Sequence, residues 1–200
     1  MIIRNLLTTL LAAALCLMAT LVHSDPLVPR YSYTPEHMRK WDDSMGRHNP
    51  DDPAWQHMMS ELRTFTKGKT DDMALLAVQL RMLDVIAKAR INYDEDPDVW
   101  MTPEAYIGAQ TPVDSDDVSV ATYAALKELG FDDVELVVVY NARWPQKPYF
   151  AVIRVTTDQG ERYVHMYTRI LMRTLPPYMT PLYGIKGHVF NLYGPHPARR

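Results

Sequence analysis

The stretch VDSDDVSVATYAALKELG, residues 113–130, decides how the rest of the chain is interpreted. Its acidic start, its alanines and leucines, Lys127 near its end and Gly130 just beyond are signals of an α-helix. They predict a largely buried helix that begins at Asp114 or Ser115. Because a helix N-terminus stabilises developing negative charge, Ser115 also occupies a position suited to a nucleophile.

The sequence after this helix predicts strands. Residues 134–142, 149–157 and 162–171 are rich in β-branched and aromatic residues, and a turn at 158–160 separates the last two segments. We expect an antiparallel meander. Residues 176–194 carry tyrosines, prolines and glycines, which predicts a final strand or two wrapped around the sheet.

The sequence before the central helix predicts further helices. Pro35 and Pro53 each follow a capping residue, which favours two short helices, the second ending near Gly68. A longer amphipathic helix is expected over residues 70–90, and residues 92–114 are expected to form a loop. We expect the apolar stripe of the longer helix to face the core; it comprises Met73, Leu76, Leu80, Leu83 and Ala87. Helices followed by strands predict an α+β fold.

Length and composition indicate one folded domain. The chain has 200 residues, of which 47% are hydrophobic and 22% charged. Residues 1–24 have a basic start, an apolar run and small residues before Ser24, which is typical of a secretory signal peptide. Residues 25–69 then form an N-terminal helical segment of the domain at 70–200. We expect a periplasmic or secreted protein with no stable membrane insertion after cleavage.

Charge and cysteine content exclude several classes of function. The net charge of −3 gives no reason to expect a nucleic-acid partner. The single cysteine, Cys16, lies in the expected signal peptide. Residues 25–200 therefore have no disulfide, no thiolate nucleophile and no cysteine-bound metal.

Four motifs in order carry a resemblance to a known family. They are DVWMTPE at 98–104, DSDD at 114–117, FAVI at 150–153 and TPLYG at 180–184. Over roughly residues 70–187 the chain resembles the bacterial transglutaminase-like cysteine peptidases, which include the LapG-type periplasmic proteases. The resemblance implies a transglutaminase or papain-like domain, with N-terminal helices and a central helix packed on an antiparallel sheet.

The resemblance also assigns catalytic positions, and this chain departs from the family at all three. Ser115 replaces the cysteine nucleophile, Phe150 falls at the position of the histidine base, and His165 or Met166 falls at the orienting aspartate. We therefore interpret the chain as a degenerate member that lacks the triad. The alternative is a peptidase, hydrolase or acyltransferase that uses Ser115 with a displaced histidine, either His165 or His188.

The acidic residues beside Ser115 allow two interpretations. In the family such residues bind calcium, which implies a calcium site at Asp114, Asp116 and Asp117. Alternatively, these carboxylates cap the helix and complement its dipole without a metal. A calcium-dependent structural domain is a further alternative.

We expect the chain to bind another envelope or secreted protein, or a peptide, through the former substrate groove. Loss of the nucleophile, base and orienter together, with the scaffold kept, motivates this hypothesis. An exposed groove of aromatic residues would suit an extended peptide. The residues expected to line it are Trp100, Tyr106, Tyr149 and Phe150.

Overall fold

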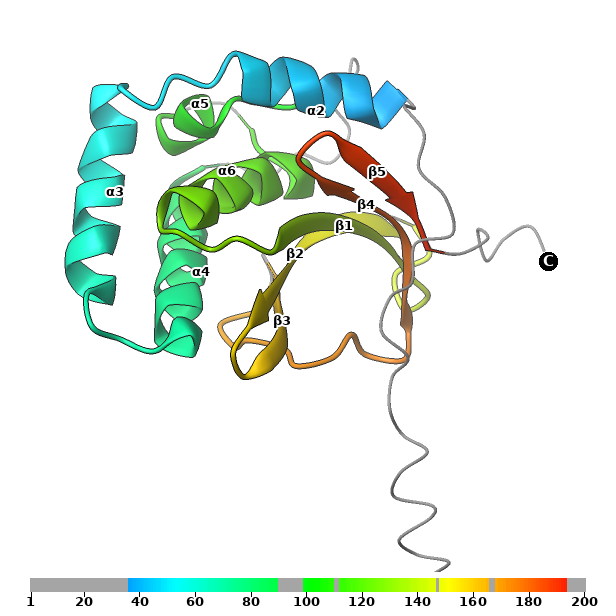
Figure 1. The fold of residues 1–200 in the computed structure, drawn as a ribbon. Helices are drawn as coiled ribbons and strands as arrows, with labels where there is room; N and C mark the ends of the chain where they lie inside the picture. The colour runs from blue at the N-terminus through cyan, green and yellow to red at the C-terminus, as the bar shows by residue number, and fades with distance from the viewer. Residues whose placement is uncertain (1–35, 90–98, 110–111, 147, 166–167, 194–200) are drawn as a thin grey trace, which may run out of the picture.

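The computed structural model describes residues 36–89, 99–109, 112–146, 148–165 and 168–193 (Figure 1). The expected signal peptide at 1–24 lies outside the described residues. The helices are α2 (Glu36–Gly46), α3 (Pro53–Thr66), α4 (Asp71–Lys88), α5 (Pro103–Ile107) and α6 (Ser115–Glu128). The strands are β1 (Val134–Asn141), β2 (Tyr149–Thr157), β3 (Gly160–Val164), β4 (Met179–Lys186) and β5 (Val189–Leu192).

The strands form one antiparallel sheet in the order β3-β2-β1-β4-β5. The predicted meander is confirmed for β1 to β3, and β4 returns to pair with the free side of β1. The third strand ends at Val164 and not at residue 171, because the chain turns back and Met172 bridges to Tyr163. Figure 1 shows a curved sheet with the helices on one face and the segment between β3 and β4 crossing the other.

Each face of the sheet carries its own apolar cluster, because side chains alternate along a strand. On the helical face, Leu136 and Ile153 pack with the buried side chains of α6. The opposite face carries a smaller cluster whose buried members are Val137, Val139, Phe150, Val152, Tyr163 and Tyr193. Helix α6 is buried along most of its length, as its sequence predicts.

Helix α4 turns a different side to the core from the one predicted. Its buried residues are Ala74, Leu75, Val78, Gln79, Met82 and Ile86. On the expected stripe, Met73 is 43% exposed and Leu80 is 38% exposed. The prediction that this stripe faces the core is therefore wrong for Met73 and Leu80, whereas Leu83 packs against the core. Helix α4 has apolar residues on two sides, and their spacing alone does not say which side is covered.

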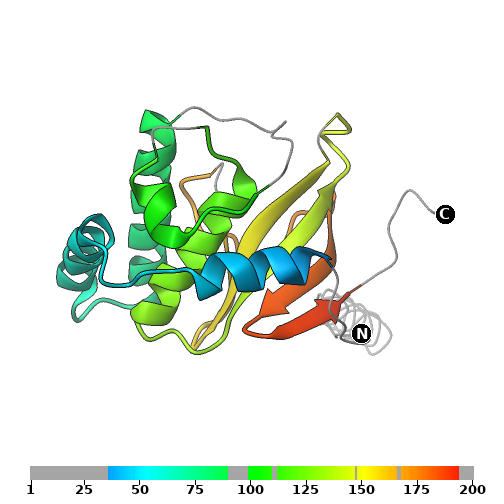
Figure 2. The ribbon, with the colours of Figure 1, turned by 90° about the horizontal axis from the view of Figure 1, so that it is seen from above.

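The expected loop before α6 contains the short helix α5. Thr102 caps α5 through a hydrogen bond from the backbone N–H of Ala105, and Pro103 occupies the first turn. Viewed from above, α2 crosses over α6 toward the β4–β5 hairpin (Figure 2). Within the described part of the chain, none of the helices is long and apolar enough to cross a membrane.

Candidate functional site

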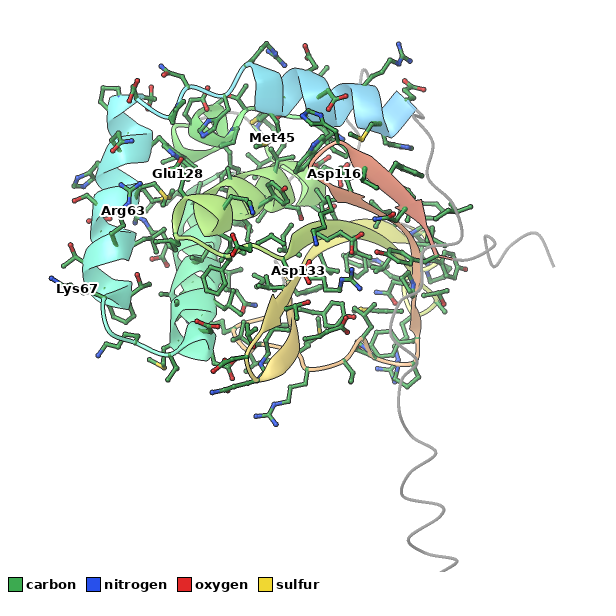
Figure 3. The ribbon with its side chains drawn as sticks, viewed as in Figure 1. Met45, Arg63, Lys67, Asp116, Glu128 and Asp133 are labelled. Atoms are coloured by element: carbon green, nitrogen blue, oxygen red, sulfur yellow. The ribbon has the colours of Figure 1, made fainter. Side chains whose placement is uncertain are left out.

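Ser115 is the first residue of α6, and the preceding residue fixes that position. The Asp114 carboxylate accepts hydrogen bonds from the backbone N–H groups of Asp116 (2.9 Å) and Asp117 (3.4 Å). In return, Asp117 accepts from the backbone N–H of Asp114 at 3.2 Å. This capping box determines where the helix begins, so the Ser115 side chain lies at its positive end. Figure 3 shows Asp116 at the opposite end of α6 from Glu128.

The Ser115 hydroxyl is held between α6 and β2. Its Oγ accepts a hydrogen bond from the backbone N–H of Ala151 and donates to Asp116 Oδ1, both at 3.4 Å, and the residue is 7% exposed. Neither partner, among the described residues, is a histidine. A carboxylate is a much weaker base than an imidazole, and serine needs an adjacent base to become nucleophilic. Among the described residues, the Ser115 hydroxyl therefore has no imidazole in hydrogen-bond contact.

Two of the carboxylates beside Ser115, those of Asp114 and Asp117, form the capping box of α6. Asp117 is 3% exposed, and its Oδ1 accepts from the backbone N–H of Met101 at 2.8 Å while Oδ2 accepts from Asp114. Calcium is bound by about six to eight oxygen ligands. Over the described ranges, no group of three or more acidic, histidine or cysteine side chains is placed to hold a metal. Asp114, Asp116 and Asp117 in this arrangement do not fit a calcium site.

Phe150 does not lie beside Ser115. Side chains alternate along β2, so Ala151 packs on the helical face while Phe150 joins the cluster on the opposite face. The resemblance assigned Phe150 to the base position, but its ring lies on the sheet face away from α6. The Phe150 ring instead meets the His165 ring edge-on, with centroids 4.9 Å apart.

The two candidate displaced bases, His165 and His188, also make other contacts. His165 follows β3, is 4% exposed, and its carbonyl accepts a hydrogen bond from the Gln79 amide at 2.9 Å. Burial lowers the pKa of His165 to about 4, so its ring is neutral near pH 7. His188 is exposed, and its Nδ1 lies 3.2 Å from Asp42 Oδ1. In the described structure neither histidine is a hydrogen-bond partner of Ser115.

Most of the expected groove residues belong to the core. Trp100 is 2% exposed and Phe150 is 5% exposed, while Tyr106 is fully buried with its hydroxyl donating to the Met82 carbonyl at 2.8 Å. Burial raises the pKa of Tyr106 far above its usual value. The prediction of an exposed groove lined by these three residues is wrong, because their rings fill space between elements. Tyr149, in contrast, is 49% exposed.

The structure adds two stacked rings, those of Tyr183 and His37, that sequence reasoning missed. Val138 of β1 pairs with Ala151 on one side and with Tyr183 on the other, so Tyr183 lies two strands from the N–H that binds Ser115. The half-buried Tyr183 ring stacks on the exposed His37 ring of α2 at 5.3 Å. These contacts join segments far apart in sequence, and no local pattern indicates them.

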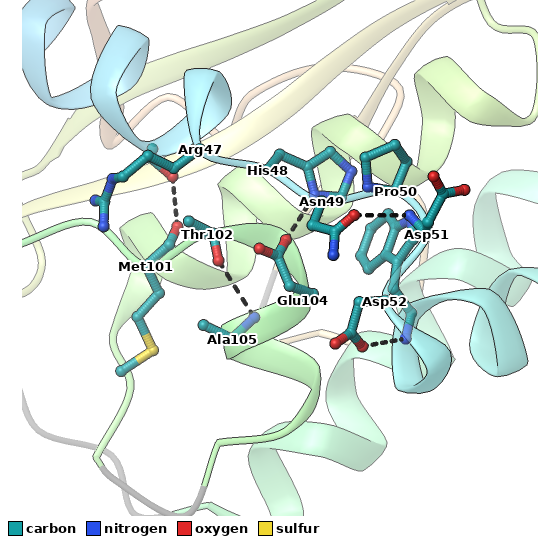
Figure 4. A network of polar contacts seen from close by, with 12 residues as sticks. Arg47, His48, Asn49, Pro50, Asp51, Asp52, Met101, Thr102, Glu104 and Ala105 are labelled. Atoms are coloured by element: carbon teal, nitrogen blue, oxygen red, sulfur yellow. Dashed lines mark hydrogen bonds and ion pairs between the residues drawn. The ribbon is translucent and has the colours of Figure 1, made fainter.

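A second missed group of contacts ties the N-terminal helices to the domain (Figure 4). His48 Nδ1 lies 2.6 Å from Glu104, and His48 Nε2 lies 3.6 Å from Glu128. Glu128 also accepts from the Trp55 indole N–H at 2.6 Å and from Arg63 at 2.9 Å. Partial burial alone would raise the pKa of Glu104, but hydrogen bonds, led by that from His48, hold it below its usual value. Glu104 thus fixes α5 to the connection between α2 and α3.

A third group of contacts lies on the sheet face away from the helices. Glu135 is 1% exposed and pairs with Arg154 at 2.5 Å, while the Tyr193 hydroxyl and the Asn191 amide both donate to its other oxygen. The carboxylate occupies space left by Gly184, where an added Cβ would lie 2.2 Å from Glu135 Oε1. Burial raises the pKa of Tyr193, which keeps its hydroxyl a donor. These contacts hold the C-terminal hairpin to β1.

A capped central helix packed on one face of an antiparallel sheet defines an α+β fold. Comparison with solved structures identifies the particular likeness, which is to LapG of Legionella pneumophila. The calcium-bound form matches with a TM-score of 0.54 and 16% identity over 78% of this chain and 87% of LapG. The EGTA-treated form matches with a TM-score of 0.53 and 17% identity over 82% and 87%.

A third LapG structure matches with a TM-score of 0.52 and 17% identity over 84% of this chain and 87% of LapG. No protein-family model matches the sequence, and no curated protein matches it. At this level of identity the comparisons confirm the predicted fold.

Proposed function

We propose that the protein is an envelope or secreted member of the transglutaminase-like class that binds a protein segment and does not cleave it. The observation that carries the proposal is the environment of Ser115: a hydroxyl at the nucleophile position, bonded to Ala151 N–H and Asp116. Serine catalysis needs a base in hydrogen-bond contact. The sequence pattern of residues 1–24, which is typical of a signal peptide, supports a periplasmic or secreted location.

The surface proposed for binding surrounds the N-terminus of α6. It combines the exposed Tyr149 with the half-buried Asp116 and Tyr183 and the exposed His37. Aromatic rings and a helix N-terminus supply apolar contact and hydrogen-bonding capacity for an extended chain. This surface replaces the groove expected from the sequence, since Trp100 and its neighbours are buried.

Calcium has no role in this proposal. LapG is known in calcium-bound and EGTA-treated forms. In this chain the corresponding carboxylates already accept backbone and hydroxyl hydrogen bonds, as the contacts of Asp114 and Asp117 illustrate. We therefore derive no calcium-dependent step for binding.

The test is a cross-linking capture from the cell envelope with matched variants. Tyr149→Glu adds a charge on the proposed surface, and Val189→Glu is its control, because both residues are 49% exposed and Val189 lies on β5. We expect a partner that is captured by the wild type and by Val189→Glu and lost with Tyr149→Glu. Capture that is indifferent to Tyr149→Glu would contradict the proposal.

The alternative of a serine hydrolase is tested separately. The wild type and Ser115→Ala are compared for hydrolysis of envelope proteins and of small ester substrates. Both are expected to show the same background rate. Hydrolysis that disappears in Ser115→Ala would overturn the non-catalytic proposal and establish the alternative.

A further inference from the structure

Helix α4 carries a buried glutamine that holds the chain beyond β3. Gln79 is 2% exposed, and its amide nitrogen donates hydrogen bonds to the carbonyl oxygens of His165 at 2.9 Å and Thr168 at 2.7 Å. Carbonyl oxygens only accept hydrogen bonds, so the nitrogen of the amide must lie on this side. The amide oxygen, Gln79 Oε1, therefore points away from these carbonyls. It is buried, and it accepts no hydrogen bond from the described residues.

Gln79 also lines a small cavity between α4, α6 and the strands β2 and β3. The cavity has a volume of about 10 Å³. The polar residues of its lining are Gln79, Ser119, Thr122 and His165, and its other lining residues are apolar. All four polar residues are buried. Thr122 Oγ1 donates to the Val118 carbonyl at 2.6 Å and keeps its capacity to accept a hydrogen bond. The cavity is therefore walled by apolar side chains but offers several hydrogen-bonding groups.

The size and the charge of the cavity decide which ligand it fits. Its volume of about 10 Å³ matches the roughly 10–15 Å³ that one water molecule needs, whereas sites for organic ligands measure about 300–1,000 Å³. Among the described residues, the lining offers no carboxylate and no cysteine, which leaves a metal ion with His165 as its one common type of ligand. A water molecule is neutral and needs only about two to four polar partners, which the lining supplies.

We propose that this cavity binds one structural water molecule, which donates a hydrogen bond to Gln79 Oε1 and bridges it to the hydroxyl of Ser119. A buried acceptor without a partner costs free energy, and buried waters occur where they satisfy such groups. The Ser119 hydroxyl can donate to the water or accept from it. The water joins α4 to the central helix α6 at the residue whose amide nitrogen holds the chain after β3. One glutamine side chain thus links three segments of the fold.

A crystal structure of the purified wild-type protein tests the site directly. We expect electron density for one water molecule at about 2.5–3.0 Å from both Gln79 Oε1 and Ser119 Oγ. Crystals pressurised with xenon should show no xenon at this place, because xenon enters dry, apolar cavities. A cavity without water density, xenon in the cavity, or a water that misses either Gln79 Oε1 or Ser119 Oγ would overturn the proposal.

Two matched variants test the same site in solution. Ser119→Val removes the hydroxyl and fills the cavity with a methyl group, and Ser60→Val is its control because Ser60 is exposed on α3. Oxygen-17 magnetic relaxation dispersion counts the water molecules that exchange slowly with the solvent. We expect Ser119→Val to hold one such water fewer than the wild type, and Ser60→Val to hold the same number.

An equal count in the wild type and Ser119→Val, or the same loss in both variants, would contradict the proposal. Circular dichroism checks that each variant is folded. If Ser119→Val does not fold, the wild-type crystal structure still decides, because it depends on no substitution.

Discussion

The burial of His165 predicts a specific loss of stability in mild acid. The ring lies edge-on to Phe150 and is 4% exposed, and burial lowers its pKa from 6.5 to about 4. The folded protein therefore holds this histidine neutral where the unfolded chain would protonate it. Between pH 6.5 and 4 the unfolded state binds more protons, so the free energy of unfolding falls as the pH falls.

The size of the effect follows from the two pKa values. One pKa unit corresponds to about 1.36 kcal/mol. The shift from 6.5 to about 4 therefore corresponds to about 3 kcal/mol, fully present above pH 6.5 and lost as the pH falls toward 4. This is a substantial part of the stability of a typical domain, roughly 5–15 kcal/mol.

Urea unfolding at a series of pH values from 4.5 to 7.5 measures this contribution. His165→Gln removes the titrating ring, and His188→Gln is the control because its side chain is 92% exposed. The wild type and His188→Gln should lose about 2–3 kcal/mol more than His165→Gln over this range. Equal pH dependence in all three proteins would refute the reasoning.

Three further predictions concern the cap, the metal and the C-terminal hairpin. Asp117→Ala removes the acceptor for the backbone N–H groups of Met101 and Asp114 and should cost about 2–3 kcal/mol in urea unfolding, with a smaller loss for Asp117→Asn. Because the carboxylates serve as caps, excess calcium and excess EGTA should give the same midpoint of thermal unfolding; a higher midpoint with calcium would show that the cap rearranges into a metal site. Gly184→Ala places a methyl group against Glu135 and should cost about 1–3 kcal/mol, and unchanged stability would show that Glu135 can move.

The central helix and the strands were predictable because their signals are local. Asp114 caps α6 by accepting hydrogen bonds from the backbone N–H groups of Asp116 and Asp117. Its capping role can therefore be inferred from the residues that follow it in the sequence. The strand segments were likewise predictable, because they are rich in β-branched and aromatic residues. The short helix α5 was missed because five residues carry too little periodicity, although the Thr102-Pro103 start was present.

The choice between two faces was not predictable, and both main errors are of this kind. On α4 both sides are apolar, so the sequence did not say that Met73 and Leu80 would be exposed. On β2 a shift of one residue reverses every side chain, and Phe150 consequently faces away from Ser115. In both cases the face that is buried depends on residues distant in sequence that pack against the helix or the strand. Trp100 was likewise expected at the surface, although it packs within the core.

The pairing of β1 with β4 makes the last described strands a condition for the whole sheet. A chain that ends before Met179 would leave β1 as an exposed edge, with Val137 and Val139 on a face from which Tyr193 had been lost. Glu135 would keep Arg154 and lose its two neutral donors. Unpaired, apolar strand edges are templates for aggregation. Incomplete chains, and full chains whose C-terminal hairpin has not yet docked, should therefore be the aggregation-prone species of this protein.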